Sequence, residues 1–196
     1  MTESEWLGCT EPTPMLEFLQ GAGVIPDTWE VDHRRKWLLF CASHKKWLLA
    51  RASFHRVHFD DDEETNQFIE QTERLVDGQG NYQQWWILAR RTGSGMPVLV
   101  NRDAGNAILL RDIFGNPFRT ISLTPDWRTP TVTSLATAAY DERILPSGEL
   151  DPARLAVLSD ALEAAGCDDS DILGHLRGPG PHVRGCWVID LLLEKA

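Results

Sequence analysis

The chain has 196 residues, of which 42% are hydrophobic and 24% charged, and its net charge is −10. This composition is typical of a folded globular protein rather than a disordered one. The negative charge disfavours general binding to nucleic acid or anionic membranes, and no run approaches the roughly 18 apolar residues of a membrane-spanning helix. Because the acidic start lacks the apolar stretch of a secretion signal, we expect a cytoplasmic protein with no membrane partner.

Several helices are predicted from capping residues and apolar spacing. Thr13, Thr129 and Asp151 each precede a proline, and a side-chain acceptor followed by proline is typical of a helix N-terminus. These pairs predict a short helix that ends near Gly21, a second helix that begins at residue 130, and a third that stops at Gly166. Helical spacing predicts further helices over residues 34–52, 62–76, 81–90, 106–114 and 169–176.

The last segment, residues 184–194, is apolar on nearly every side, which predicts a buried, central helix. Strand signals are weak, and the best candidate contains Pro97, which limits it to an edge or an extended loop. We therefore predict a mainly α fold, a single compact multi-helix domain over residues 1–196. It would have at most a short β element near 96–100 and a possible irregular insert over 54–101.

Asp190 lies inside this apolar last segment. A buried carboxylate must be paired, and we predict a structural ion pair with Arg111, with Arg143 and Arg177 as alternative partners. A catalytic acid at this position is the competing interpretation.

Two Cys/His pairs have a spacing suited to zinc: Cys41 with His44, and His182 with Cys186. Zinc takes four nitrogen or sulfur ligands in a tetrahedron, and residues three or four apart on a helix or turn can supply two of them. His175 and Cys167 are possible substitute ligands. The alternative is that the cysteines are small core residues and the histidines are hydrogen-bonded, because free cysteine is among the most buried residue types.

A basic segment precedes an acidic one in the first third of the chain. Seven Lys and Arg residues and no acidic residue lie between His33 and His58, and five acidic residues run from Asp60 to Glu64. Such neighbouring charge runs are typical of solvated faces. The alternative function is a nucleic-acid-associated protein that uses residues 34–56, where tryptophans alternate with basic residues.

The chain contains neither a G-x-S-x-G nor an H-E-x-x-H motif, and no phosphate-binding glycine fingerprint. This favours a non-catalytic protein. We expect an α-helical binding or interaction module whose partner is another protein, with an exposed tryptophan-rich apolar patch and a structural zinc. A small enzyme is the alternative, and it would place His175 or His182 beside a carboxylate or a thiol.

Four stretches carry a resemblance to a known family. Residues 1–19 (MTESEWLGCTEPTPMLEFL), 110–119 (LRDIFGNPFR), 129–143 and 166–187, the last of which contains GPGPHVRGCW, resemble an expanded family of uncharacterised planctomycete-type bacterial proteins. The resemblance implies no particular activity. Members usually have a cysteine-rich helix around Cys41 and a cysteine after the position that matches His175. This chain has Ser43 and Leu176 there, whereas His44 retains a possible ligand.

Overall fold

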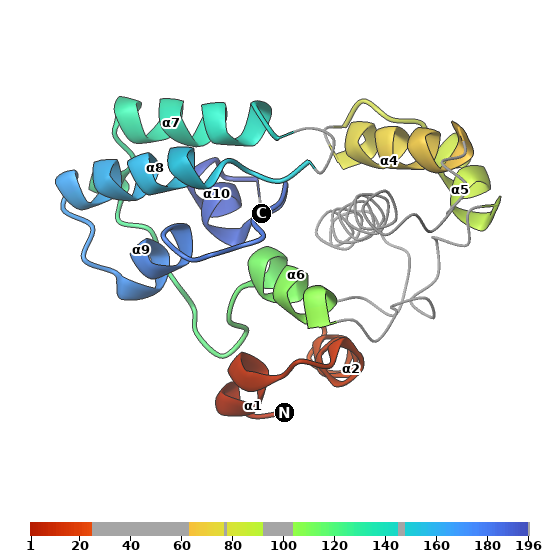
Figure 1. Ribbon diagram of the computed structural model, residues 1–196, viewed down its shortest axis with the longest axis horizontal. Coiled ribbons are helices and arrows are strands. Elements are labelled where there is room, and N and C mark those ends of the chain that lie inside the picture. Colours follow the sequence, from red (N-terminus) through yellow and green to blue (C-terminus); the bar gives the residue numbers. More distant parts are fainter. Residues whose placement is uncertain (25–62, 77, 92–103, 145–147, 196) are drawn as a thin grey trace. The chain divides into compact units, whose positions relative to one another are not determined.

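The computed structural model describes residues 1–24, 63–76, 78–91, 104–144 and 148–195. In these ranges every regular element is a helix, which confirms the predicted mainly α fold (Figure 1). The chain divides into two compact units, Met1–Leu110 and Arg111–Ala196, and the boundary lies within α6 (Ala104–Phe114). The single domain over residues 1–196 stays a prediction. No helix in the described ranges is long and apolar enough to span a membrane.

The first unit begins with two short helices, α1 (Glu3–Gly8) and α2 (Pro12–Gly21). Trp6 is fully buried and its ring lies 6.2 Å from that of Phe18. The predicted N-cap at Thr13 is wrong, because α2 begins at Pro12 without a side-chain cap. The fixed φ of proline already suits the first helical turn, so Thr13 falls inside the helix.

Further along the same unit, α4 (Glu63–Val76) and α5 (Tyr82–Arg91) pack together as a helical hairpin (Figure 1). Trp85 is buried between them, and its indole N–H donates to Thr72 Oγ1 at 2.9 Å. The Thr72 hydroxyl in turn donates to the carbonyl of Phe68. The helices agree with the predicted ranges to within a residue. The predicted helix over 34–52 and the β element near 96–100 lie outside the described residues.

The second unit contains the end of α6 and five further helical elements: the 3-10 turn η3 (Pro125–Trp127), α7 (Pro130–Asp141), α8 (Pro152–Ala164), α9 (Ser170–Leu176) and α10 (Trp187–Leu192). The predicted caps are confirmed. Thr129 accepts from the amide of Val132, and Asp151 accepts from that of Ala153. Each satisfies a donor that the first helical turn would otherwise leave without a partner.

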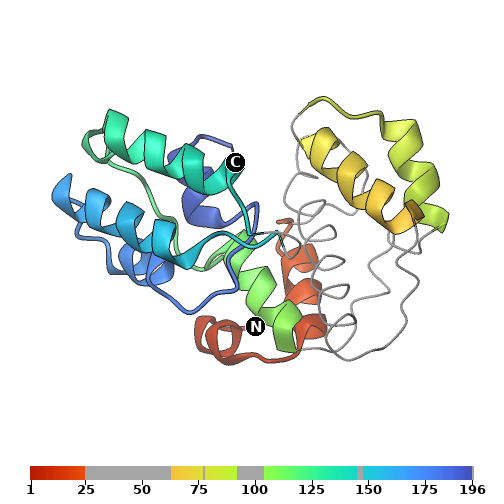
Figure 2. The ribbon, with the colours of Figure 1, turned by 45° about the horizontal axis from the view of Figure 1, so that its top comes forward.

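The four α-helices of residues 130–192 pack around one hydrophobic core. Helix α8 contacts both α7 and α9, and α10 contacts α7 and α9 as well (Figures 1 and 2). The core includes Leu155, Leu158, Leu162, Ile172, Val188, Ile189 and Leu192. The predicted burial of the last helix is therefore confirmed, but its length is not.

Helix α10 begins at Trp187 rather than at residue 184. Gly185 has φ +97° and the N-cap residue Cys186 has ψ 124°, so the backbone before Trp187 is not helical. The preceding loop pairs with the α7–α8 connection through an isolated β-bridge between Val183 and Glu149, where the amide of Leu150 donates to the carbonyl of His182 at 2.8 Å. This pairing fixes the backbone on both sides of His182.

Candidate metal centre

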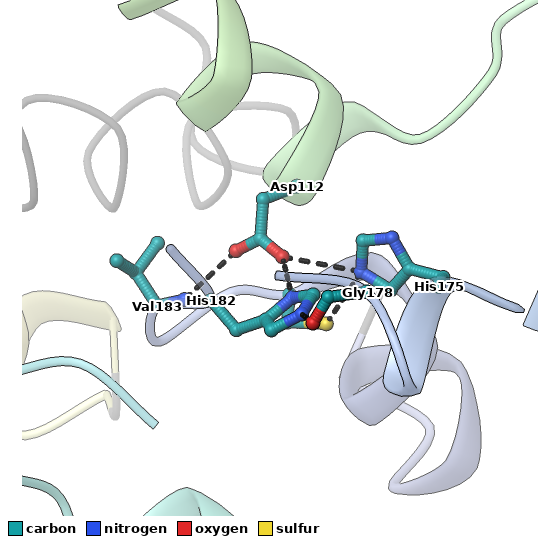
Figure 3. A network of polar contacts seen from close by, with 6 residues as sticks. Asp112, His175, Gly178, His182 and Val183 are labelled. Carbon is teal, nitrogen blue, oxygen red and sulfur yellow. Dashed lines mark hydrogen bonds and ion pairs between the residues drawn. The ribbon is translucent and has the colours of Figure 1, made fainter. Parts of the chain in front are cut away.

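Four side chains from separate segments of the second unit converge on one point: Asp112, His175, His182 and Cys186 (Figure 3). Asp112 lies in the last turn of α6, His175 in the last turn of α9, His182 in the loop after α9, and Cys186 at the N-cap of α10. One ligand atom of each lies within 4.8 Å of all the others. We call these residues the four-residue cluster.

The closest contacts within the cluster are made by Asp112 Oδ1 and His175 Nε2. Asp112 Oδ1 lies 2.8 Å from His182 Nδ1 and 3.1 Å from His175 Nε2. His175 Nε2 also lies 3.2 Å from the sulfur of Cys186. The imidazole rings of His175 and His182 meet edge to face, with their centroids 4.7 Å apart. An oxygen, two nitrogens and a sulfur therefore share a small volume.

Contacts outside the cluster orient two of its members. The second carboxylate oxygen of Asp112 accepts the amide N–H of Val183 at 2.8 Å, which leaves Oδ1 to face the histidines. The outer nitrogen of His182, Nε2, lies 3.4 Å from the carbonyl of Gly178. A proton on Nε2 would donate to this carbonyl and leave Nδ1 as the free ligand atom. Such outer contacts are typical of metal-binding histidines.

The loop between α9 and α10 needs a glycine to bring His182 into place. Gly180 has φ +70°, a conformation that side-chain-bearing residues rarely adopt. A Cβ atom there would lie 2.9 Å from the backbone nitrogen of His182. The glycine-rich sequence before His182 thus has a structural cause, because the chain turns sharply and closely against this residue.

Burial and the contacts of Asp112 act together on the protonation of the cluster. The side chains of Asp112 and His182 are only 2% and 4% exposed, and Cys186 is fully buried. Burial alone would raise the pKa of Asp112, but hydrogen bonds from His175 and His182 outweigh it and lower that pKa. Burial would likewise lower the pKa of His182, but the hydrogen bond and charge of Asp112 raise it. Burial, reinforced by the charge of Asp112, raises the pKa of Cys186 well above its usual value.

The arrangement differs from a cysteine–histidine–aspartate catalytic relay. In a relay the thiol contacts one ring nitrogen and the carboxylate the other, whereas here both contact Nε2 of His175. One nitrogen cannot at once accept the thiol proton and donate to the carboxylate. The raised pKa of Cys186 also works against a free nucleophilic thiolate. Histidine does lie beside both a carboxylate and a thiol, but the geometry is that of converging ligands.

The structure unites part of the predicted zinc set. His182 and Cys186 both belong to the cluster. A third position is taken by His175, which the sequence offered as one of two substitute ligands. Cys167 is buried but is not part of the cluster. Cys41 and His44 lie outside the described residues, so their role stays a prediction. Sequence reasoning missed Asp112.

The predicted partner of Asp190 is not settled by the described contacts. Asp190 is buried in α10, and its ion pair with Arg111 stays a prediction. Arg177, one of the alternatives, instead bonds Asp160 and Glu163 of α8 at 2.9 and 2.6 Å.

The tryptophan-rich exposed patch expected of an interaction module also stays a prediction. Eight large hydrophobic side chains are exposed among the described residues, and none is a tryptophan: Leu7, Val24, Tyr82, Ile87, Ile108, Phe118, Ile144 and Val157. Trp29, Trp37 and Trp47, together with the whole basic segment, lie outside the described residues.

No family model, curated protein or solved structure matches the chain. The resemblance to planctomycete-type proteins and the assignment of a protein partner therefore stay predictions, and the geometry of the cluster carries the functional argument.

Proposed function

We propose that the protein binds one zinc ion through Asp112, His175, His182 and Cys186, and that this ion stabilises the C-terminal helical unit. One observation carries the proposal. Four donor atoms from four separate segments lie within 4.8 Å of one another, in a position where three of the side chains are nearly inaccessible to solvent. Buried polar side chains of this kind are costly unless they pair or bind a metal.

The donor set favours zinc among the common metals. One thiolate, two imidazoles and one carboxylate match the ligands that zinc takes in proteins, whereas magnesium and calcium take oxygen ligands only. Zinc bonds of about 2.0–2.3 Å place neighbouring tetrahedral donors about 3.3–3.6 Å apart. The measured separations of 2.8, 3.1 and 3.2 Å need to grow by only about half an ångström or less.

A bound ion would also explain how the buried thiol of Cys186 can lose its proton. The pKa of this buried thiol is raised, but a coordinated thiol loses its proton to become a ligand. The ion would then join the ends of α6, α9 and α10 to the loop around His182. Because such a site does not exist in the unfolded chain, the free energy of metal binding adds to the free energy of folding. At a free metal concentration of about 1,000 times Kd, the gain is about 4 kcal/mol.

The test is elemental analysis of the full chain purified without chelator, with two alanine variants of buried cysteines. We expect about one zinc per wild-type chain. Cys186→Ala should lose the metal and unfold at a lower urea concentration. Cys167→Ala is the matched control, because Cys167 is 3% exposed but outside the cluster, and it should retain the metal. Equal zinc content in both variants would refute the proposal, as would a folded wild type that binds no zinc when the metal is supplied.

A further inference from the structure

We infer that His175 is an exchangeable ligand, and that a small monodentate nitrogen or sulfur base from solution can take its place on the metal. This inference rests on the proposed zinc site and adds to it a position open to an external ligand. The reason is that the cluster is anchored unequally. The side chains of Asp112 and His182 are held by backbone groups and that of Cys186 by complete burial, whereas that of His175 is partly exposed.

The three anchored ligands are fixed by contacts that do not depend on a metal. Asp112 is held by the amide of Val183, and the outer nitrogen of His182 faces the carbonyl of Gly178. Cys186 is fully buried, and its backbone bonds on both sides: its amide donates to Val183, and its carbonyl accepts from Asp190, each at 2.9 Å. Moving the side chain of Asp112 or His182 away from the centre would break its contact with the backbone, and the fully buried side chain of Cys186 could leave only through the surrounding core.

His175 is held differently. Its side chain is 18% exposed, against 2% for Asp112 and 4% for His182. Its Nε2 faces the cluster (Figure 3), while its Nδ1 has no hydrogen-bond partner among the described residues. The ring is otherwise positioned by packing against His182 and against Trp187, whose centroid is 5.2 Å away. Ring packing of this kind gives far less directional restraint than the outer hydrogen bonds of typical metal-binding histidines.

The position of His175 in the chain permits it to leave without unfolding its surroundings. It lies in the last turn of the seven-residue helix α9, two residues before the C-cap Arg177. A change of side-chain rotamer moves the imidazole toward solvent and leaves the backbone in place. The metal would then keep three protein ligands and one open position, which is the ligand count of zinc sites that bind small molecules. Azide is a small monodentate nitrogen base that can fill that position, and as an anion it differs from the imidazole of His175 that it would replace.

The experiment uses the full chain loaded with Co²⁺, which replaces Zn²⁺ and reports its ligands by visible absorption. Azide is titrated into the wild type and into His175→Ala, and bound cobalt is measured after desalting. We expect a saturable spectral change in wild type without metal loss. His175→Ala should bind cobalt more weakly than wild type but still retain it, because three ligands remain, and should bind azide at least about tenfold more tightly than wild type. His182→Ala is the matched control and should hold no cobalt under the same conditions.

Two results would overturn the inference. One is a wild-type cobalt spectrum that azide leaves unchanged, and the other is a His175→Ala variant that loses cobalt as completely as His182→Ala. The wild-type titration decides the matter by itself if His175→Ala does not fold. A folded wild type that binds neither zinc nor cobalt fails at the earlier step and overturns the proposed function itself, so the two failures are distinguishable.

Discussion

Replacing Asp112 by alanine should strongly destabilise the protein even when a chelator keeps it metal-free. The carboxylate accepts three interactions at once: His182 at 2.8 Å, His175 at 3.1 Å and the amide of Val183 at 2.8 Å. All three would lose this acceptor in a region where water cannot replace it, because Asp112 is only 2% exposed. The variant therefore tests whether the cluster organises the fold as well as a metal.

The magnitude follows from the burial. Leaving the buried amide of Val183 without an acceptor costs about 1–3 kcal/mol. Breaking a buried ion pair by removing one partner costs about 3–5 kcal/mol in total, and this is the loss expected for Asp112→Ala. Asp171 offers a matched control, because it also makes an ion pair at 2.8 Å, with Arg119. These two side chains are 41% and 52% exposed, so Asp171→Ala should cost only about 1 kcal/mol.

Urea unfolding in chelator, followed by tryptophan fluorescence and by far-ultraviolet circular dichroism, measures both losses. Trp187 lies 5.2 Å from His175, so part of the emission of the eight tryptophans comes from beside the cluster. Equal losses for Asp112→Ala and Asp171→Ala would refute the reasoning, because they would mean that the depth of the carboxylate makes no energetic difference.

Three further changes have defined outcomes. Gly180→Ala should cost about 1–2 kcal/mol from its φ of +70° and should weaken zinc binding measured by chelator competition; unchanged affinity would show that the loop does not position His182. Trp85→Phe should cost about 1–2 kcal/mol, because the α4–α5 hairpin loses the bond to Thr72 Oγ1; unaltered urea unfolding would contradict this. Finally, the pKa of His182 is raised above 6.5 by Asp112, so its contribution to metal-free stability is complete below pH 6.5 and is lost as pH rises through the folded-state pKa. Urea midpoints measured upward from pH 6 should show that loss in wild type and not in Asp112→Ala.

The helix boundaries were predictable wherever a local capping interaction defines them. Thr129 and Asp151 lie where their side chains cap the next turn, and these interactions span only a few residues. The N-cap expected at Thr13 failed because Pro12 also satisfies the start of a helix, one residue earlier than Thr13 itself. Two adjacent start signals compete, and sequence alone does not rank them.

The last helix shows how tertiary structure overrides apolar periodicity. Residues 184–194 have a helical pattern, yet α10 spans only Trp187–Leu192. Gly185 at φ +97° and the β-bridge from Val183 to Glu149 keep the preceding backbone out of the helix. That bridge depends on a partner 34 residues away, and the carbonyl of His182 accepts from Leu150 within the same contact. Periodicity could not reveal a constraint that arises from the α7–α8 connection.

Only two of the four residues of the candidate site, His182 and Cys186, were in the predicted zinc set, for a similar reason. His182 and Cys186 are four residues apart on one turn, so their proximity follows from the local chain. Asp112 is 70 residues from His182 in the chain. Because zinc prefers nitrogen and sulfur ligands, the sequence favours cysteine and histidine as ligands over any of the 29 acidic residues.

A signal for Asp112 was nevertheless present in the sequence. It lies in the run Ile108-Leu109-Leu110-Arg111-Asp112-Ile113-Phe114, as Asp190 lies in the apolar last helix. The argument that a carboxylate on an apolar helix must be buried and paired, which predicts a partner for Asp190, holds equally for Asp112, which is 2% exposed and bonded to two histidines. Burial on an apolar helix thus identifies Asp112 as a site residue, where the spacing of cysteine and histidine does not. The same logic places Asp190, one turn after Cys186 on α10, among the residues to test next for an effect on the metal.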